Sequence, residues 1–287
     1  MRTLRTRAEL REALAEPRRA GRSIGFVPTM GGLHEGHLSL LRAARERCDV
    51  VVMSLFVNPA QFGSGEDLDA YPRDEARDAA LAASEGVDLL YAPSDDEVYP
   101  EGFDTTVEVA NLTEVLCGEP DLRGPQHFRG VTTVVAKLLN LVQPDVAFFG
   151  QKDAQQAVVI RRMVRDLDYP VEIEVLPTVR EPDGLAMSSR NRYLSEAERA
   201  RALALSRGLQ AAERAAGDGA DLEATLAAAR SELDAAGIEP EYLEARDPED
   251  LSTVAELNGR PVLIAVAARV GSARLIDNVV VESTAAE

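Results

Sequence analysis

The feature that most constrains the fold is a strand, a glycine turn, a helix and a second strand within residues 24–57. Residues 24–27 form an apolar run typical of a short buried strand, and the apolar residues of 38–44 recur at the spacing of one helix face. Residues 49–57 are almost continuously apolar, which is typical of a strand covered on both faces of a parallel sheet. Two such strands joined by a helix form a βαβ unit with a right-handed crossover. The chain is therefore predicted to begin with an α/β domain.

The turn between that first strand and its helix predicts an anion site. Gly31 and Gly32 have no β-carbon, so backbone N–H groups can approach a ligand, and the following helix points its positive end into the turn. If Glu35 opens the helix, His34 and His37 share one face of its first turn and could reach the same phosphate group. An ordinary glycine turn before a helix is the alternative at this point.

A metal site at the two histidines is a further alternative. Zinc usually takes three or four protein ligands. His127 is the only other histidine of the chain, and Cys48 and Cys117 are unpaired single cysteines. The pattern therefore favours phosphate over metal.

Composition limits the functional classes. A net charge of −18 argues against a nucleic-acid-binding surface, which needs lysine and arginine. The sequence has no run of eighteen apolar residues and no charged-then-apolar leader, so we expect neither a membrane span nor a secretory signal. Two cysteines without a pattern fit a reducing compartment, and we expect a cytoplasmic protein. An acidic protein that binds polyphosphate must concentrate cations locally, which makes cations in turns informative.

The strand–turn–helix pattern recurs at residues 145–166. The apolar run 145–149 ends at Gly150, and Lys152 follows in the turn, where it would be a natural phosphate cation. Asp153 is placed to cap the helix that follows, to about Asp166. Of Gln155 and Gln156 on the first turn of this helix, at least one should face the crevice at the end of the sheet.

Polar residues also follow the strand of residues 49–57. Asn58 and Gln61 lie at its carboxyl end, the edge where open α/β sheets bind ligands. They are placed to donate hydrogen bonds into the same crevice as the histidines. Turn-capping amides are the alternative interpretation.

Several further elements are predicted from periodicity and from glycine and proline positions. Residues 124–130 read as a loop that is not readily helical, which either faces a substrate or is solvated. The predicted helices lie at about 1–14, 71–84, 112–116 and 131–141, and the predicted strands at 87–91, 105–109 and 171–175.

The sequence changes character after residue 177. A turn-rich hinge leads into a loop with two hydroxyls and two arginines, Ser188, Ser189, Arg190 and Arg192, which we expect to form a mobile cationic arm. Two alanine-rich helices and three strands follow, the last two joined by a hairpin at residues 270–272. We predict a Rossmann-like domain over 1–177 and an α+β lid domain over 178–287.

These features together favour a nucleoside triphosphate bound between the two domains and attacked at phosphorus. The chain has no G-x-x-x-x-G-K-[ST] sequence of a P-loop, and no G-x-G-x-x-G follows its first strand to indicate a dinucleotide. The fold class predicted from the residues is α/β, with a doubly wound parallel sheet.

The motifs resemble those of a known family. His34-Glu35-Gly36-His37 resembles the H-x-G-H signature of the nucleotidylyltransferase superfamily, and residues 187–190 (Met-Ser-Ser-Arg) resemble its matching loop. With the motifs at 56–62, 71–73, 127–131 and 149–156, the chain resembles the pantoate–β-alanine ligase family from about residue 24 to residue 281.

The resemblance implies a fold and a reaction. Members of this family are cytoplasmic homodimers with a Rossmann-like domain and a C-terminal lid. They condense pantoate with β-alanine through a pantoyl-adenylate intermediate, using ATP and Mg²⁺.

The resemblance also implies a set of site residues. His37 is expected as proton donor, and His34, Lys152 and Arg190 are expected to meet the phosphate charge with it. Gln61 is expected to contact pantoate and β-alanine, and Gln156 to contact pantoate. The expected ATP contacts are Met30, Gly31, Gly32, Leu33, His34, Glu35, Gly36, His37, Gly150, Gln151, Lys152, Asp153, Val179, Met187, Ser188, Ser189 and Arg190.

The chain departs from the family pattern at a few positions. Gln151 stands where glutamate is usual, and Ala154 where an aromatic residue is usual. Arg77 and Asp78 replace an acidic pair, so the expected Mg²⁺ contact falls to Asp78 alone.

Two other functions remain open from the sequence. One is a nucleotidylyltransferase that acts on a phosphorylated acceptor, although this reading gives no role to Gln61 and Gln156. The other is a catalytically silent nucleotide-binding module, which the intact histidines, Lys152 and Arg190 disfavour.

Overall fold

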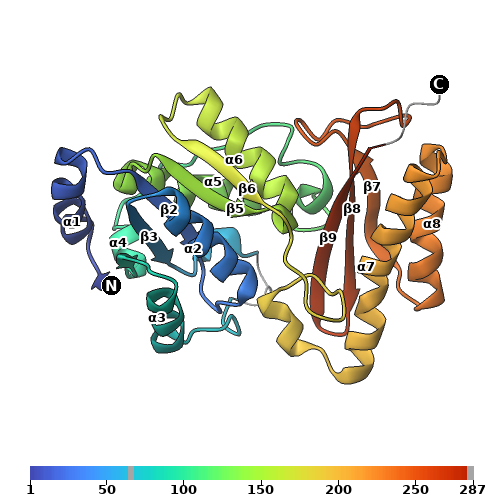
Figure 1. Ribbon diagram of the computed structural model, residues 1–287, viewed down its shortest axis with the longest axis horizontal. Coiled ribbons are helices and arrows are strands. Elements are labelled where there is room, and N and C mark those ends of the chain that lie inside the picture. The colour runs from blue at the N-terminus through green and yellow to red at the C-terminus, as the bar shows by residue number, and fades with distance from the viewer. Residues whose placement is uncertain (64–67, 283–287) are drawn as a thin grey trace. The chain divides into compact units, whose positions relative to one another are not determined.

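The computed structural model describes residues 1–63 and 68–282 and divides into two compact units (Figure 1). The N-terminal unit contains Met1–Glu114, Gly118–Gly150 and Val159–Pro177. The C-terminal unit contains Val115–Cys117, Gln151–Val158 and Thr178–Glu287. Lys152 and the predicted cationic loop of residues 188–192 thus belong to the same unit.

The N-terminal unit is built on a parallel sheet of six strands in the order β1-β4-β3-β2-β5-β6. Its strands are β1 (Arg2–Leu4), β2 (Ile24–Thr29), β3 (Val50–Leu55), β4 (Leu89–Tyr91), β5 (Val146–Gly150) and β6 (Glu172–Leu176). The strand order runs outward from β2 in one direction and from β5 in the other, which is the doubly wound arrangement predicted from the sequence.

Helices cover both faces of this sheet. Apolar side chains of α2 and α3 pack with Val27, Val51 and Met53 on one face. Those of α1, α5 and α6 pack with Phe26 and Val52 on the other. The helices are α1 (Arg7–Arg19), α2 (Glu35–Arg47), α3 (Glu75–Ser84), α4 (Asp95–Val98), α5 (Pro125–Val142) and α6 (Ala154–Asp166), with the short 3₁₀ turn η1 (Pro59–Gln61). The 3₁₀ turns η2 (Leu116–Gly118) and η3 (Gln151–Asp153) and the first residues of α6 fall wholly or mostly in the C-terminal unit.

The sheet brings the ends of two strands to one edge. β2 and β5 pair in parallel, with Gly25 opposite Val146 and Phe26 opposite Ala147. Because parallel strands end at the same edge, the carboxyl ends of β2 and β5 are neighbours, at the point where the strand order reverses. Open α/β sheets bind ligands at this point.

The C-terminal unit is an antiparallel sheet covered by two helices, as predicted. Its strands, in the order β7-β8-β9, are β7 (Pro240–Arg246), β8 (Pro261–Val270) and β9 (Ala273–Glu282). The helices α7 (Glu196–Gly217) and α8 (Leu222–Ala235) bury Leu205, Leu209 and Leu233 in a core shared with alternate residues of β8. A fourth 3₁₀ turn, η4 (Ser189–Tyr193), precedes α7. The predicted β8–β9 hairpin is confirmed, with Gly271 at φ +59° in its turn.

Several predictions of local structure were wrong. Residues 2–4 form the edge strand β1, and the first helix runs from Arg7 to Arg19. Residues 125–130 open α5, because Pro125 fits the first helical position and Gly124, at φ +74°, turns the chain into it. Residues 105–109 do not form a strand. Val107 instead donates its N–H to Thr133 Oγ1 at 2.9 Å and accepts from Thr132 Oγ1 at 2.5 Å.

The short helix predicted at residues 112–116 was also wrong. Residues 112–115 form turns and bends, and the 3₁₀ turn η2 begins only at Leu116. Asn111 and Leu116 have φ of +67° and +51°, and backbone in this left-handed region does not continue a right-handed helix.

None of the helices in the two described ranges is both long enough and apolar enough to cross a bilayer.

Candidate active site

The histidine turn, residues 30–37, joins β2 to α2, and its two imidazoles cap the helix. His34 is the N-cap of α2, and its Nδ1 accepts the N–H of Gly36 at 3.2 Å. The Nδ1 of His37 accepts the N–H of His34 at 3.4 Å. The two ring centroids lie 4.2 Å apart with an interplanar angle of 46°. The structure thus confirms that Glu35 opens the helix and that both rings lie at its first turn.

These caps decide which nitrogen of each ring carries the proton. An Nδ1 that accepts a backbone N–H must present a lone pair, so the neutral ring has its proton on Nε2. Each neutral imidazole therefore carries its proton on Nε2, the nitrogen that does not cap the helix. Capping the helix and donating to a ligand are compatible uses of one histidine, because they employ different nitrogens.

The glycines of the histidine turn bring its backbone against a carboxylate of the protein. Gly31 and Gly32 have φ of +92° and +63°. The N–H groups of Gly32 and Leu33, however, donate to the carboxylate of Asp78 at 2.8 and 2.9 Å. A β-carbon at Gly31 would lie 2.8 Å from Leu55 Cδ1. The glycines thus permit the turn to close on Asp78, and two of its backbone donors are already bonded.

Asp78, expected as a contact to Mg²⁺, lies 1% exposed with both carboxylate oxygens accepting backbone N–H groups. Arg77 also donates to Asp78 Oδ1, at 3.4 Å. Within residues 1–63 and 68–282, no group of three or more histidine, cysteine, aspartate or glutamate side chains is arranged to hold a metal ion. The described residues therefore do not fit a protein-held Mg²⁺ site.

Gln61, expected to contact pantoate and β-alanine, lies in a buried amide cluster at the end of β3. The residue is 8% exposed, and its side chain accepts from Asn58 Nδ2 at 3.0 Å and donates to Met30 Sδ at 2.9 Å. His127, on the first turn of α5, donates from Nδ1 to the Gln61 carbonyl at 2.7 Å. The cluster connects η1, α5 and the start of the histidine turn.

Asn58, also expected as a substrate contact, has its amide fully used inside the protein. Nδ2 donates to Gln61 Oε1 and to the Gly130 carbonyl at 3.1 Å, and Oδ1 accepts from Ala60 N and from Tyr99 Oη at 2.7 Å. Burial raises the pKa of Tyr99 to about 12, although its bond to Asn58 acts in the opposite direction. The phenol therefore stays a donor at neutral pH. Sequence reasoning placed Asn58 at the correct edge, but missed Tyr99.

A cavity of about 400 Å³ adjoins the histidine turn within the N-terminal unit. Met30, Gly31 and Asp78 contribute to its wall, which also contains apolar residues of β3 and the acidic start of α3. Its described lining is Met30, Gly31, Leu55, Phe56, Val57, Pro59, Leu68, Asp69, Pro72, Arg73, Asp74, Glu75, Asp78, Pro93 and Asp95.

The lysine turn, residues 150–153, follows β5 and forms η3. Lys152 is 19% exposed, and its Nζ lies 3.6 Å from Asp153 Oδ1. Gln155 is occupied structurally, since it accepts from Cys117 N at 3.0 Å and donates to the Val115 carbonyl at 2.6 Å. Gln156 is half-buried. Of the two glutamines, Gln156 is therefore the better candidate to face a substrate.

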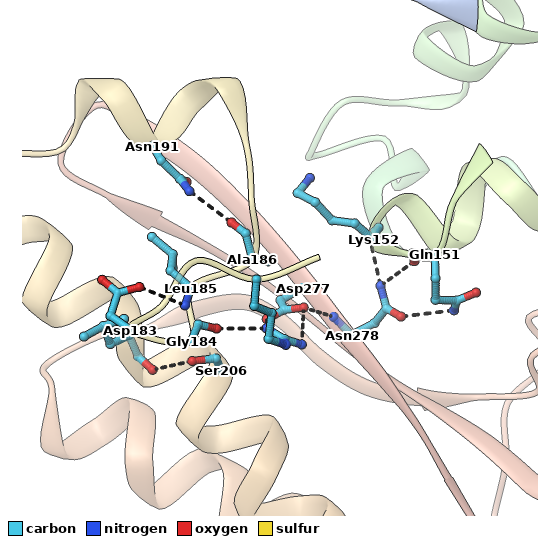
Figure 2. A network of polar contacts seen from close by, with 12 residues as sticks. Gln151, Lys152, Asp183, Gly184, Leu185, Ala186, Asn191, Ser206, Asp277 and Asn278 are labelled. Carbon is cyan, nitrogen blue, oxygen red and sulfur yellow. Dashed lines mark hydrogen bonds and ion pairs between the residues drawn. The ribbon is translucent and has the colours of Figure 1, made fainter. Parts of the chain in front are cut away.

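The arginine loop, residues 178–193, is fastened at its base. Arg180 and Ala186 form an antiparallel bridge, and Met187 N donates to Val179 O at 3.0 Å. Ser188 then caps η4 by accepting from Arg190 N at 3.3 Å. Asn191 donates to the Ala186 carbonyl at 3.0 Å (Figure 2).

Two acidic residues of the arginine loop bind α7. Arg199 donates to Glu181 at 2.6 Å and to Asp183 at 2.9 Å. Burial alone would raise the pKa of both carboxyls, but the bonds from Arg199, with Asn191 for Glu181 and the Leu185 N–H for Asp183, bring each pKa below its usual value. The predicted mobile arm thus has an anchored base.

The remaining expected ATP contacts are distributed over these three segments. Glu35 is exposed and forms an ion pair with Arg42. Gly36, Val179, Ser189 and Arg190 are all half-buried.

The fold and these turns define a class of protein. A doubly wound parallel sheet with a histidine-capped helix after one central strand and a lysine turn after its neighbour is typical of nucleotide-binding α/β proteins. Comparison with known proteins places the chain more narrowly. The family model of pantoate–β-alanine ligase matches residues 2–280, and the chain belongs to that family. It is an enzyme that joins pantoate to β-alanine.

Individual relatives resemble the chain over nearly its whole length. Pantothenate synthetase 1 of Bradyrhizobium diazoefficiens is 58% identical over 95% of both chains. The crystal structure of pantothenate synthetase from Thermus thermophilus is 51% identical, with a TM-score of 0.91 over 97% of this chain and 99% of that one. Pantoate–β-alanine ligase from Francisella tularensis, complexed with β-γ ATP and β-alanine, is 32% identical, with a TM-score of 0.80 over 97% of each chain.

Proposed function

We propose that the chain condenses pantoate with β-alanine in two steps, through a pantoyl-adenylate intermediate, and releases pyrophosphate and AMP. Similarity to pantoate–β-alanine ligases over residues 2–280 is the observation that carries this proposal. The F. tularensis relative complexed with β-γ ATP and β-alanine supports ATP as the co-substrate.

In the first step a pantoate carboxylate oxygen attacks the α-phosphorus of ATP. A new P–O bond forms, the bond from the α-phosphorus to the bridging oxygen breaks, and pyrophosphate leaves. Negative charge grows on the phosphoryl oxygens and on the leaving group. The Nε2–H donors of His34 and His37 have the chemistry to meet that charge, and we propose His37 as the proton donor.

We assign the remaining phosphate contacts to Lys152, Ser188, Ser189 and Arg190. An ammonium group and a guanidinium group are suited to phosphate oxygens, and the hydroxyls add neutral donors. The loss of one such contact in a transition state typically costs about 3 kcal/mol of barrier.

In the second step the amine of β-alanine attacks the acyl carbon of the adenylate. The C–N bond forms, the C–O bond to phosphate breaks, AMP leaves and the amine loses a proton. We propose that Gln61 faces both pantoate and β-alanine and that Gln156 faces pantoate. Asn58, Tyr99 and His127 would hold Gln61 in place, because their hydrogen bonds fix its amide and its carbonyl.

The other expectations remain proposals of this family assignment. We propose that Mg²⁺ enters bound to the phosphates of ATP, because magnesium usually keeps several waters and substrate oxygens as ligands. We also propose that the protein is a cytoplasmic homodimer, with the unit after residue 178 acting as a lid that keeps water from the adenylate.

Pyrophosphate exchange tests the proposed reaction. ATP and labelled pyrophosphate should exchange when pantoate is added, and AMP should be released only after β-alanine follows. Other hydroxy acids serve as controls for substrate choice. Exchange that requires a phosphorylated acceptor, and not pantoate, would instead support a nucleotidylyltransferase.

A further inference from the structure

Two adjacent residues of β9, Asp277 and Asn278, carry buried polar side chains that no role in the reaction has yet explained. Asp277 is 3% exposed and Asn278 is 5% exposed. A buried carboxylate or amide is costly unless it is hydrogen-bonded. The partners of these two side chains are therefore informative, and they lie in two different loops of the C-terminal unit.

Asn278 holds the backbone of the lysine turn. Its Nδ2 donates to the carbonyls of Gln151 and Lys152 at 3.0 and 2.9 Å (Figure 2). Its Oδ1 accepts from Gln151 Nε2 at 3.1 Å. The orientation of this amide is fixed, because a flipped amide would place Oδ1 against two carbonyl oxygens. Figure 2 shows the Lys152 side chain directed away from these bonds, which leaves its ammonium group at the end of a fixed backbone.

Asp277 holds the base of the arginine loop. Arg180 donates to Asp277 through Nη1 at 2.6 Å and through Nη2 at 3.1 Å. This bidentate pair fixes the orientation of the guanidinium group as well as its distance. Arg180 Nη1 also donates to the Gly184 carbonyl at 3.2 Å. The antiparallel bridge between Arg180 and Ala186 closes a short hairpin over residues 180–186, directly before residues 187–190.

The two residues are also joined through the backbone of Asn278. The N–H of Asn278 donates to Asp277 Oδ1 at 2.8 Å. The side chain of Asn278 thus holds the lysine turn, while its backbone N–H binds Asp277, which in turn binds Arg180. Each member is buried or half-buried, so water does not compete freely for these bonds.

We propose that Asp277 and Asn278 form a positioning pair that fixes the Lys152 ammonium group relative to the arginine loop. The cationic groups assigned to the phosphates of ATP would then keep one arrangement. This inference rests on the proposed function, which assigns Lys152 and residues 188–190 to ATP. The pair acts through these residues and is not itself catalytic. A cation misplaced by about 1 Å can cost on the order of 100-fold in rate, so the pair matters to the chemistry without touching it.

Asn278→Asp is the most direct test, because it keeps the size of the side chain and replaces its donors by acceptors. A carboxylate facing the carbonyls of Gln151 and Lys152 should release the lysine turn. We expect pantoate-dependent pyrophosphate exchange to fall by roughly 10- to 100-fold and ATP to bind more weakly. Asn278→Ala removes the amide without adding charge and should act in the same direction.

Two control variants separate positioning from stability and from charge. Val281→Ala lies on the same strand, 2% exposed, and should lower the unfolding temperature while exchange at room temperature stays near the wild-type rate. Asn258→Asp adds the same charge at an exposed position of the same unit and should change neither property.

A double-mutant cycle with Lys152→Ala gives the decisive readout. If Asn278 acts through Lys152, then Asn278→Asp should change exchange by less than about threefold in the Lys152→Ala background. An Asn278→Asp variant with wild-type exchange, or one that is equally harmful with and without Lys152, would overturn the proposal. ATP affinity measured by titration calorimetry gives the same cycle without turnover.

The outcome is distinguishable from failure of the proposed function. Wild-type exchange is measured first, and its absence with pantoate would count against the reaction. The calorimetric cycle would still decide whether Asn278 positions Lys152 toward ATP. Asp277→Asn, combined with Arg190→Ala in the same way, tests the other half of the pair.

Discussion

The histidine turn and the lysine turn both follow a central strand and both precede a helix, yet the protein holds them by opposite chemistry. In the histidine turn the N–H groups of Gly32 and Leu33 are held by the carboxylate of Asp78. In the lysine turn the carbonyls of Gln151 and Lys152 are held by the amide of Asn278. The first turn thus uses backbone donors internally, and the second uses backbone acceptors.

This difference indicates how each turn can meet an anion. An N–H that already donates to Asp78 is a poor partner for a phosphate, so under the proposed function anion binding at the histidine turn would fall mainly to the two imidazoles. The lysine turn relies on an ammonium group carried by a fixed backbone. Similar strand–turn–helix sequences can therefore place their positive groups by different means.

Removal of the phosphate-facing side chain from each turn should have the largest effect. We expect His37→Ala and Lys152→Ala each to lower pantoate-dependent exchange by roughly 100- to 1,000-fold. Only His37→Ala should also reduce stability, by about 1 kcal/mol, because Nδ1 of His37 caps α2. Exchange kinetics and urea unfolding of both variants measure this. Equal stability losses would contradict the distinction.

Removal of the support of the histidine turn should have the next largest effect. Asp78→Ala leaves the N–H groups of Gly32 and Leu33 without their acceptor, which should cost about 1–3 kcal/mol for each buried group. Urea unfolding measures the loss. Asp74→Ala is a less severe comparison, since Asp74 caps the same helix α3 from an exposed position. An Asp78→Ala variant as stable as the wild type would argue against this support.

A methyl group added to one glycine of each turn should separate them further. Gly31→Ala should lose about 1–3 kcal/mol, because φ is +92° and the new carbon would meet Leu55 and Asp78. Gly150→Ala meets nothing within 4 Å and should stay within about 0.5 kcal/mol. Thermal unfolding measures both. A drop in activity of Gly150→Ala without a loss of stability would indicate a ligand close to that backbone.

Acid should weaken the ion pairs that hold the arginine loop to α7, and we expect this effect to be the smallest. Glu181 and Asp183 have lowered pKa values in the folded state, so their contribution to stability is present above their usual values of 4.5 and 3.8 and is lost as the pH falls through the lowered ones. Arg199→Leu removes their shared partner. The gap in unfolding temperature between wild type and this variant should narrow from about pH 5 to pH 3. A constant gap would contradict the assignment.

Much of the architecture was predictable because its signals are local. The apolar runs before Pro28 and Gly150 and the periodic helices after them indicated the parallel sheet. β1 was missed because three residues carry no measurable periodicity. The alternating residues 105–109 resemble a strand, but Thr132 and Thr133 of α5 take the backbone bonds of Val107.

The candidate site was predictable where chemistry lies in the turns themselves, as with His34, His37 and Lys152. The residues that support those turns were not predictable. Asp78 accepts a hydrogen bond from Gly32, which lies 46 positions away in the sequence, and Asn278 donates one to Gln151, which lies 127 positions away. No spacing in a sequence encodes such pairs, because they exist only after the sheet and the hairpin have formed. Side chains of this kind resemble ordinary buried polar residues until their partners are known.

The pairing of β8 with β9 also determines where the side chains of Asp277 and Asn278 lie. Ala265 stands opposite Asn278 and Val266 opposite Asp277, and the tight turn at Gly271 sets that alignment. Gly271 has φ +59°, a conformation that residues with a β-carbon rarely adopt, so the turn tolerates little change. Insertion of a single residue there would exchange the directions of the two side chains and present a carboxylate to two carbonyls. The length of a distant hairpin thus governs where a lysine points, and natural variation in that length should be rare.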